Sequence, residues 1–326
     1  MDNYEDIKNN TLLHRQLLIE KMLKGNKKTR IINFGMNPGF VSELAKYTIR
    51  KYAELKGYKL VDGDYAKLCA DMGLMKLIVA EYDNTKTNLE IDKNVFYNDW
   101  SPLGLTAEGL DSVMMSISKE EEERMLEAGF KIIKPDEGKK NSRVRFLPSV
   151  AIDMMDDCIT YDHNENLINY KGYLIPHAEI ISLSDFLNYK GDAPTIFYCY
   201  RPCDDALESI ENVRKNGYKP LESYYPIEKK DIVNDCFDSI GALCVFKNGD
   251  HFWGGSVITM DDVNKLGFKY ATPTSTQVAG GLYSAIIYIL NHQNISLNEA
   301  ETMKSRELMK TAKKYMGKIF YKLYKV

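Results

Sequence analysis

The feature that most constrains the fold is the stretch RIINFGMNPGFVSELAKYTIRKYA at residues 30–53. It begins with a short apolar run, passes through a turn that contains glycine and proline, and continues as a long segment with helical periodicity. Phe40, Leu44, Thr48 and Tyr52 recur every four residues, which is typical of a helix that packs one face on a core. A strand that enters a helix through a tight turn predicts an α/β protein.

The rest of the chain continues the alternation of strands and helices. LIVAEYD, VFYNDW and TIFYCY are expected strands, and GYLIPHAEIISLSDFL leads from a strand into a helix. Asn248 and Gly249 separate GALCVF from HFWGGSV, and Asn-Gly between two such runs predicts a β-hairpin. Glu120 to Glu123 are expected on a solvated helix face. We therefore predict a mixed sheet flanked by helices.

Length and composition describe an ordinary folded protein. The chain has 326 residues, 44% hydrophobic residues, 27% charged residues and a net charge of -3. That length suits about two domains of roughly 150 residues. The weak net charge gives no reason to expect nucleic-acid binding. No apolar run approaches the roughly 20 residues that span a bilayer, and the start, MDNYEDIKNN, is acidic and polar. We expect a cytoplasmic protein without a membrane span.

Cysteine and histidine spacing predicts no metal site. The six cysteines are scattered, and Cys199 and Cys203 form the one close pair, which we interpret as reduced packing residues. The five histidines show no HExxH or similar spacing. Metal catalysis therefore has no support in the sequence.

The turn Asn37-Pro38-Gly39 is a candidate binding element. It places the backbone amides of residues 39–41 at a helix N-terminus, where partial positive charge favours anions or carbonyl dipoles. The alternative is that proline and glycine only shape the backbone at this junction. The dinucleotide fingerprint G-x-G-x-x-G is absent from the whole sequence.

A second set of residues favours a cationic ligand. Glu81 and Trp100 lie at the ends of the expected strands LIVAE and VFYNDW, and Glu108 follows in SPLGLTAEGL. Carboxylates pair with an ammonium group, and an indole face attracts one with about 0.5–2 kcal/mol. The alternative is that Trp100 belongs to the core. His177, in LIPHAEI, is either an acid/base group or a structural histidine in an apolar strand.

Several segments, taken in order, resemble bacterial-type homospermidine synthase, an enzyme of the saccharopine dehydrogenase-like group. The resemblance runs from about Leu12 to about Met303 and is specific as an ordered set. The segments are NFGMNPGFVSELAKYTI, IVAEYD, VFYNDWSPLGLTAEGL, IPHAEIISLSDFL, YCYRPCDDAL, DSIGALCVFKNGDHFWGGS and ATPTSTQVAGGLYSAIIYIL.

The resemblance implies an enzyme of polyamine biosynthesis that uses bound NAD. Such an enzyme oxidises putrescine to an imine, loses ammonia, joins the carbon to a second amine, putrescine or spermidine, and returns the hydride. By position, Trp100 matches the aromatic residue that holds the cationic intermediate. The other implied site residues are Glu81, Glu108, His177 and Asp238 in the amine pocket, and Asn37, Pro38 and Gly39 toward NAD.

The sequence departs from the family at several places. The family begins with a complete Rossmann half, of which residues 11–36 resemble only the last helix and strand. DSVMMSISKEEEE replaces a glycine-rich stretch, and CITYDHNENLIN resembles an insertion. We predict a Rossmann remnant at residues 1–40, a substrate domain at 41–303 and a basic C-terminal helix at 304–326. The exposed sheet edge of such a remnant favours a homodimer or a separate Rossmann-domain chain.

Three functional hypotheses follow. The first is a homospermidine synthase-like enzyme, completed by a Rossmann chain. The second is a polyamine-binding or regulatory remnant without catalysis. The third is a saccharopine-type dehydrogenase, which needs an arginine for a substrate carboxylate; Arg143 and Arg145 are the candidates, and a structural role is the alternative for both.

Overall fold

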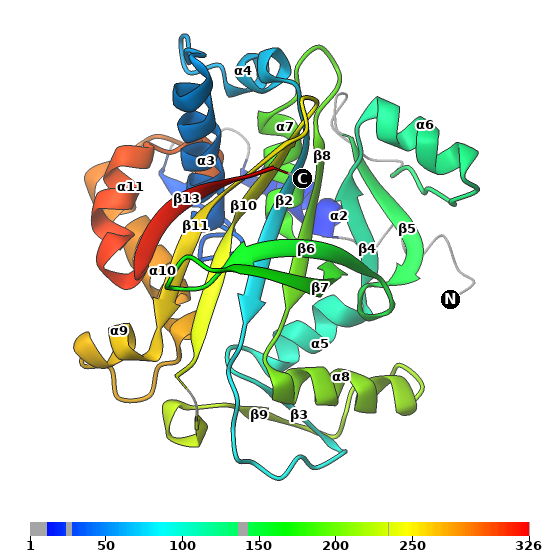
Figure 1. Ribbon diagram of the computed structural model, residues 1–326, viewed down its shortest axis with the longest axis vertical. Helices are drawn as coiled ribbons and strands as arrows, with labels where there is room; N and C mark the ends of the chain where they lie inside the picture. The colour runs from blue at the N-terminus through cyan, green and yellow to red at the C-terminus, as the bar shows by residue number, and fades with distance from the viewer. Residues whose placement is uncertain (1–11, 24–27, 136–142, 234, 326) are drawn as a thin grey trace.

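The computed structural model describes residues 12–23, 28–135, 143–233 and 235–325. A mixed nine-stranded sheet runs through the centre of the molecule (Figure 1). Its main path has the order β13-β11-β10-β2-β8-β4-β5, and the hairpin β6–β7 joins it through β8. The strands are β2 Leu74–Asp83, β4 Ser112–Ser116, β5 Val144–Val150, β6 Met155–Tyr161, β7 Leu167–Ile175, β8 Thr195–Arg201, β10 Phe237–Phe246, β11 Asp250–Thr259 and β13 Lys318–Lys325. The predicted α/β class with a mixed sheet is confirmed.

The pairing of the central strands fixes where the candidate residues lie. β2 and β8 are parallel, with Glu81 opposite Tyr200. β2 and β10 are antiparallel, with Asp83 opposite Asp238. The predicted hairpin at Asn248-Gly249 is confirmed, because β10 and β11 pair antiparallel on either side of it.

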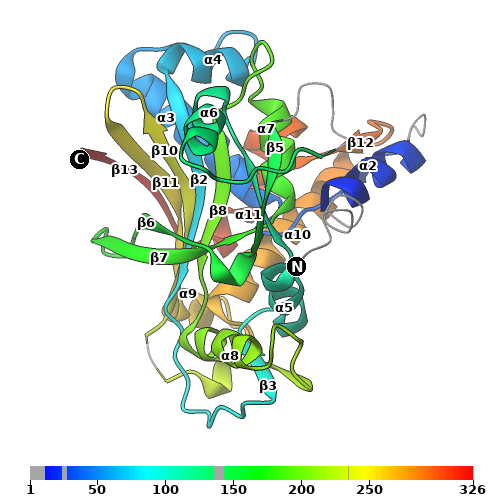
Figure 2. The same cartoon turned by 90° about the vertical axis from the view of Figure 1, so that its right-hand side faces the viewer.

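Helices cover one face of the sheet, and the β6–β7 hairpin crosses the other (Figure 1). Figure 2 shows the same arrangement from the side. Helix α3, Phe40–Lys56, packs on β10 and β11, whereas α7, Ala178–Phe186, packs on β4 and β8. The expected inner face of α3 is buried. The close approach of α3 to β11 depends on Gly254 of β11, because a Cβ atom at this position would clash with the Thr48 side chain of α3. The other helices on this side are α10, Pro273–Asn291, and α11, Ser305–Ala312.

A smaller layer lies at one end of the sheet (Figure 1). It consists of the parallel pair β3, Val95–Asn98, and β9, Ser223–Pro226, with helices α5, Pro102–Leu110, and α8, Asp204–Lys215. Strand β3 ends at Asn98, so Trp100 lies in the turn that leads into α5 and not in the strand as expected.

The described segments before α3 pack on the rest of the chain. Helix α2, Leu12–Leu23, contacts α7, and the two-residue strand β1, Arg30–Ile31, pairs with β12, Leu297–Asn298. The strand expected in the apolar run RIINF is thus limited to two residues in the structure. The division at residue 40 stays a prediction.

The other described helices are short. They are α4 Tyr65–Met72, α6 Lys119–Glu127, α9 Met260–Lys265 and the short 3-10 turns Ala151–Asp153, Lys229–Asp231, Ala300–Thr302 and Lys313–Tyr315. Among the described helices, none is long and apolar enough to cross a membrane.

The predicted C-terminal helix over residues 304–326 is wrong for its second half. Helix α11 ends at Ala312, and residues 318–325 form the edge strand β13, which pairs with β11. KIFYKLYK is rich in aromatic and aliphatic residues that favour a strand, and its lysines suit a sheet edge. Residue 326 lies outside the described residues.

Candidate functional site

Glu81 is a buried carboxylate near the end of β2. Its side chain is 3% exposed, and it accepts hydrogen bonds from the Tyr198 hydroxyl on β8 and from the Asn37 amide. Burial raises the pKa of Glu81 to about 7, against the opposing effect of these two hydrogen bonds. Glu81 can therefore gain or lose a proton close to neutral pH.

His177 lies between two glutamates just before α7. Its Nδ1 atom is 2.7 Å from Glu179 Oε2, and its Nε2 atom is 3.6 Å from Glu108 Oε1 on α5. Burial disfavours the imidazolium form, but Glu179 and then Glu108 raise the pKa of His177 well above its ordinary value. The imidazole ring packs against Tyr198 at 4.9 Å between centroids, which places His177 and Glu81 around one tyrosine.

Trp100 joins this group through a second tyrosine. Its indole N–H donates to the Tyr200 hydroxyl at 3.0 Å, and Tyr200 stacks on Tyr198 at 5.6 Å. The indole is half-buried and packs against the core, which agrees with the structural alternative, and its attraction for a cation stays a prediction. Gly104 leaves it room, because a Cβ atom there would lie 2.9 Å from the indole ring.

Asp238 lies beside this group on β10. It is fully buried, its Oδ2 atom accepts a hydrogen bond from Thr274, and its Oδ1 atom has no partner among the described residues. Burial, followed by the charges of Glu81 and Asp83, raises the pKa of Asp238 well above its ordinary value. The structure thus brings Glu81, His177 and Glu108 together, with Trp100 and Asp238 adjoining.

Two of the three backbone amides that the sequence offers at the Asn37-Pro38-Gly39 turn bind carbonyl oxygens of the chain itself and not an anion. The N–H of Phe40 donates to Gly35 and that of Val41 to Met36, at 3.1 and 2.8 Å. Both amides are therefore used inside the turn. The small cavity beside Pro38 and Gly39 is lined by three glutamates, which are Glu179, Glu299 and Glu301. Asn37 itself contacts Glu81.

Sequence reasoning missed the two tyrosines and Glu179. Tyr198 and Tyr200 alternate in TIFYCY, so a strand presents both side chains on one face. That alternation, together with Glu81 on another expected strand, is a pattern in the sequence that indicates the two tyrosines as site residues. Glu179 follows His177 by two residues, but its contact depends on how the chain enters α7.

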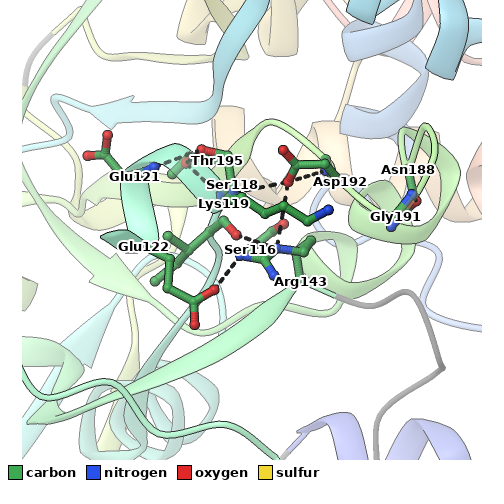
Figure 3. Close-up of polar contacts among 12 residues, drawn as sticks. Ser116, Ser118, Lys119, Glu121, Glu122, Arg143, Asn188, Gly191, Asp192 and Thr195 are labelled. Atoms are coloured by element: carbon green, nitrogen blue, oxygen red, sulfur yellow. Dashed lines mark hydrogen bonds and ion pairs between the residues drawn. The ribbon is translucent and has the colours of Figure 1, made fainter. Parts of the chain in front are cut away.

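Arg143 and Arg145, the arginines considered for a substrate carboxylate, belong to a different cluster. Both form ion pairs with Glu122 of α6, and Arg143 also hydrogen-bonds the Ile117 carbonyl. Figure 3 shows Arg143 between Glu122 and Asp192, which lies 3.7 Å from it. Both guanidinium groups are therefore engaged in ion pairs within the fold. This arrangement gives the saccharopine-type hypothesis no support.

Comparison with known proteins finds homospermidine synthases. The chain is 24% identical over 333 residues to that of Blastochloris viridis and 24% identical over 322 residues to that of Mesorhizobium japonicum. These alignments cover 96% and 95% of this chain but 65% and 64% of the relatives, so the chain spans about two thirds of their length. No family model matches the sequence.

A solved structure shows the same similarity in three dimensions. The homospermidine synthase of Legionella pneumophila, crystallised with NAD, matches with a TM-score of 0.82 at 25% identity. The match covers 100% of this chain and 68% of that one. This chain is therefore similar to homospermidine synthases in sequence and in fold over nearly its whole length.

Proposed function

We propose that the described residues form the amine site of a homospermidine synthase-like protein of polyamine metabolism. The reaction is NAD-dependent transfer of an aminobutyl group from putrescine to a second amine, putrescine or spermidine, through imine intermediates. The observation that carries the proposal is Glu81, a buried carboxylate with hydrogen-bond donors on one side and no lysine or arginine paired with it among the described residues. Such a group suits an ammonium ligand.

Each site residue has a role in binding or proton transfer. Glu81, with a pKa of about 7, binds an ammonium group and accepts a proton from it, which leaves the amine nitrogen with a free lone pair. The Trp100 ring face attracts a second cationic centre. His177 is held as a cation by Glu179, and it orients the partly exposed Glu108 for the far end of the diamine.

The described residues do not fit the pyrophosphate of NAD. The fingerprint G-x-G-x-x-G does not occur in the sequence, the amides of Phe40 and Val41 are occupied, and glutamates line the cavity at Pro38 and Gly39. A contact between Asn37 and the nicotinamide end stays a prediction. We therefore assign the hydride-transfer steps to none of the described residues, and the proposal places NAD binding on residues outside them or on a separate Rossmann-domain chain.

The second candidate function is polyamine binding without catalysis, as a regulatory protein or in a homodimer. The misfit with pyrophosphate favours this candidate, because the amine site does not require NAD to bind a diamine. The domain division proposed from the sequence, with a substrate domain at residues 41–303, applies to both candidates.

Calorimetry with putrescine and spermidine tests the amine site that both candidates share. We expect binding by the full chain and at least about tenfold weaker binding by Glu81→Gln, a loss of roughly 1.4 kcal/mol. Glu120→Gln removes an exposed carboxylate on α6 and is the matched control, with unchanged affinity. If neither amine binds, both candidates are wrong.

Product analysis separates the two candidates. The chain is incubated with putrescine and NAD, alone and with the purified N-terminal third of a homospermidine synthase. Homospermidine in either mixture supports the enzyme. Amine binding without homospermidine in both mixtures supports the non-catalytic protein.

A further inference from the structure

A second buried group lies at the end of the sheet that faces α8 and β3 (Figure 1). Asp83 is the last residue of β2, Asp99 follows β3, and Cys203 precedes α8 as its N-cap. One carboxylate oxygen of each aspartate and the Cys203 sulfur all lie within 4.8 Å of one another. The three residues are 0%, 3% and 0% exposed. Three segments that are far apart in the sequence thus bring together three atoms of the kind that bind metal ions, and all three residues are shielded from water.

The ligand atoms are poorly satisfied by the protein itself. Neither carboxylate oxygen of Asp99 accepts a hydrogen bond of normal geometry from the described residues, and Asp83 Oδ2 also lacks one. Asp83 Oδ1 accepts the Thr85 N–H at 2.8 Å. Native proteins rarely leave buried carboxylate oxygens without a partner, because the uncompensated charge costs several kcal/mol.

No basic side chain among the described residues forms an ion pair with this group. Arg201 comes near, but its guanidinium donates to the backbone carbonyl of Asp83 and pairs with the carboxylate of Asp204. Asn98, which is fully buried, accepts the Cys203 S–H at 3.8 Å, and its Nδ2 atom has no partner in the described structure. The cluster therefore holds two carboxylates and a thiol close together, and no lysine or arginine among the described residues pairs with either carboxylate.

We propose that Asp83, Asp99 and Cys203 bind a divalent cation of intermediate softness, such as Zn²⁺. Two carboxylate oxygens and one thiolate are ligands that such an ion accepts, and hard ions such as Mg²⁺ disfavour the sulfur. Tetrahedral coordination puts these atoms roughly 3.3–3.5 Å apart, so small side-chain movements within the observed 4.8 Å limit complete it. Asn98 Oδ1, beside the sulfur, is placed to supply a fourth ligand.

The metal proposal does not rest on the amine function, but the two sites adjoin, because Asp83 lies two residues after Glu81 on β2 and Asp99 directly precedes Trp100. A bound ion would fix the turn that carries the indole.

Cobalt titration of the full-length protein, after treatment with EDTA, tests the proposal. We expect one Co²⁺ per chain with a near-ultraviolet thiolate-to-cobalt absorption band, displaced by Zn²⁺. Cys203→Ser is expected to remove the band and Asp99→Asn to weaken binding by at least about tenfold. Cys244→Ser is the control, because Cys244 is equally buried but lies in the middle of β10. Elemental analysis of the untreated protein gives the native ion.

Three outcomes would overturn the metal site. They are absence of stoichiometric Co²⁺ and Zn²⁺ uptake, a thiolate band that persists in Cys203→Ser, and protection of the apoprotein against thermal unfolding by putrescine with none by metal. The last result would assign the acids to an amine instead. If Cys203→Ser does not fold, Asp83→Asn and Asp99→Asn give the same comparison through affinity.

Discussion

Glu122 of α6 and Glu81 of β2 are both nearly buried glutamates, 5% and 3% exposed, but the fold surrounds them with different partners. Glu122 pairs with Arg143 (Figure 3), and also with Arg145 from β5 and with Lys134. Burial alone would raise its pKa, but these bases lower it to about 2. Glu81 forms no ion pair with a lysine or arginine among the described residues, and burial raises its pKa to about 7.

The difference separates a structural ion cluster from a ligand site. Glu122 finds its counter-charges within the folded protein, so its carboxylate needs no external cation. The carboxylates of the Glu81 region, with Asp83, Asp99 and Asp238, depend on protons or on an external cation for neutralisation. This contrast supports the proposal that the second region binds cations.

The largest expected effect on stability is that of Glu122→Gln, compared with the same substitution at Glu81. Glu122→Gln leaves Arg143 and Arg145 without their carboxylate, so the free energy of unfolding should fall by roughly 3 kcal/mol at pH 8. Glu81→Gln removes a buried negative charge without a basic partner, so stability should stay equal or increase. Guanidinium unfolding measures both. Equal losses at the two positions would contradict the comparison.

The pH dependence of stability should differ in the same way. Glu81 has a folded pKa of about 7 against an ordinary 4.5, so the folded state holds the extra proton and the free energy of unfolding falls as pH rises from 4.5 to about 7. Glu122 has a folded pKa of about 2, so its contribution is present above 4.5 and is lost as pH falls toward 2. For an isolated group each change is on the order of 3 kcal/mol.

Unfolding curves across this pH range, recorded for the parent and for each glutamine variant, check the pH prediction. Glu81→Gln should flatten the slope between pH 4.5 and 7 and leave the acid limb unchanged. Glu122→Gln should flatten the acid limb only. If the free energy of unfolding of Glu81→Gln still falls steeply between pH 4.5 and 7, another group causes this pH dependence.

The sequence predicts the sheet, the β10–β11 hairpin and the helix α3 because their periodicities are local. It predicts wrongly where tertiary contacts decide. The run Glu120 to Glu123 was expected to face water, but Glu122 turns inward because Arg143 and Arg145, about 20 residues later, reach it from β5. The C-terminal segment carries a helical charge pattern as far as Ala312 and then pairs with the edge of β11.

The candidate site shows the same limit. Glu81 and Trp100 are found from the sequence because each lies at or just beyond the end of an expected strand. Asp83, Asp99 and Cys203 are separated by 16 and 104 positions, so no spacing motif joins them, and only the meeting of β2, β3 and α8 brings their ligand atoms together.

The smallest expected effect concerns the indole of Trp100. Two substitutions test separately its aromatic ring face and its N–H hydrogen bond. Trp100→Phe keeps an aromatic face but loses the hydrogen bond to Tyr200, whereas Trp100→Leu loses both. If the ring face attracts the ammonium group, calorimetry should show that Leu weakens diamine binding by about 2- to 30-fold, or 0.5–2 kcal/mol, and that Phe keeps most of the affinity. Equal losses in both variants would instead assign the role of Trp100 to its N–H and the position of Tyr200. Neither substitution should change the pH slopes of Glu81 or Glu122, because the indole carries no charge.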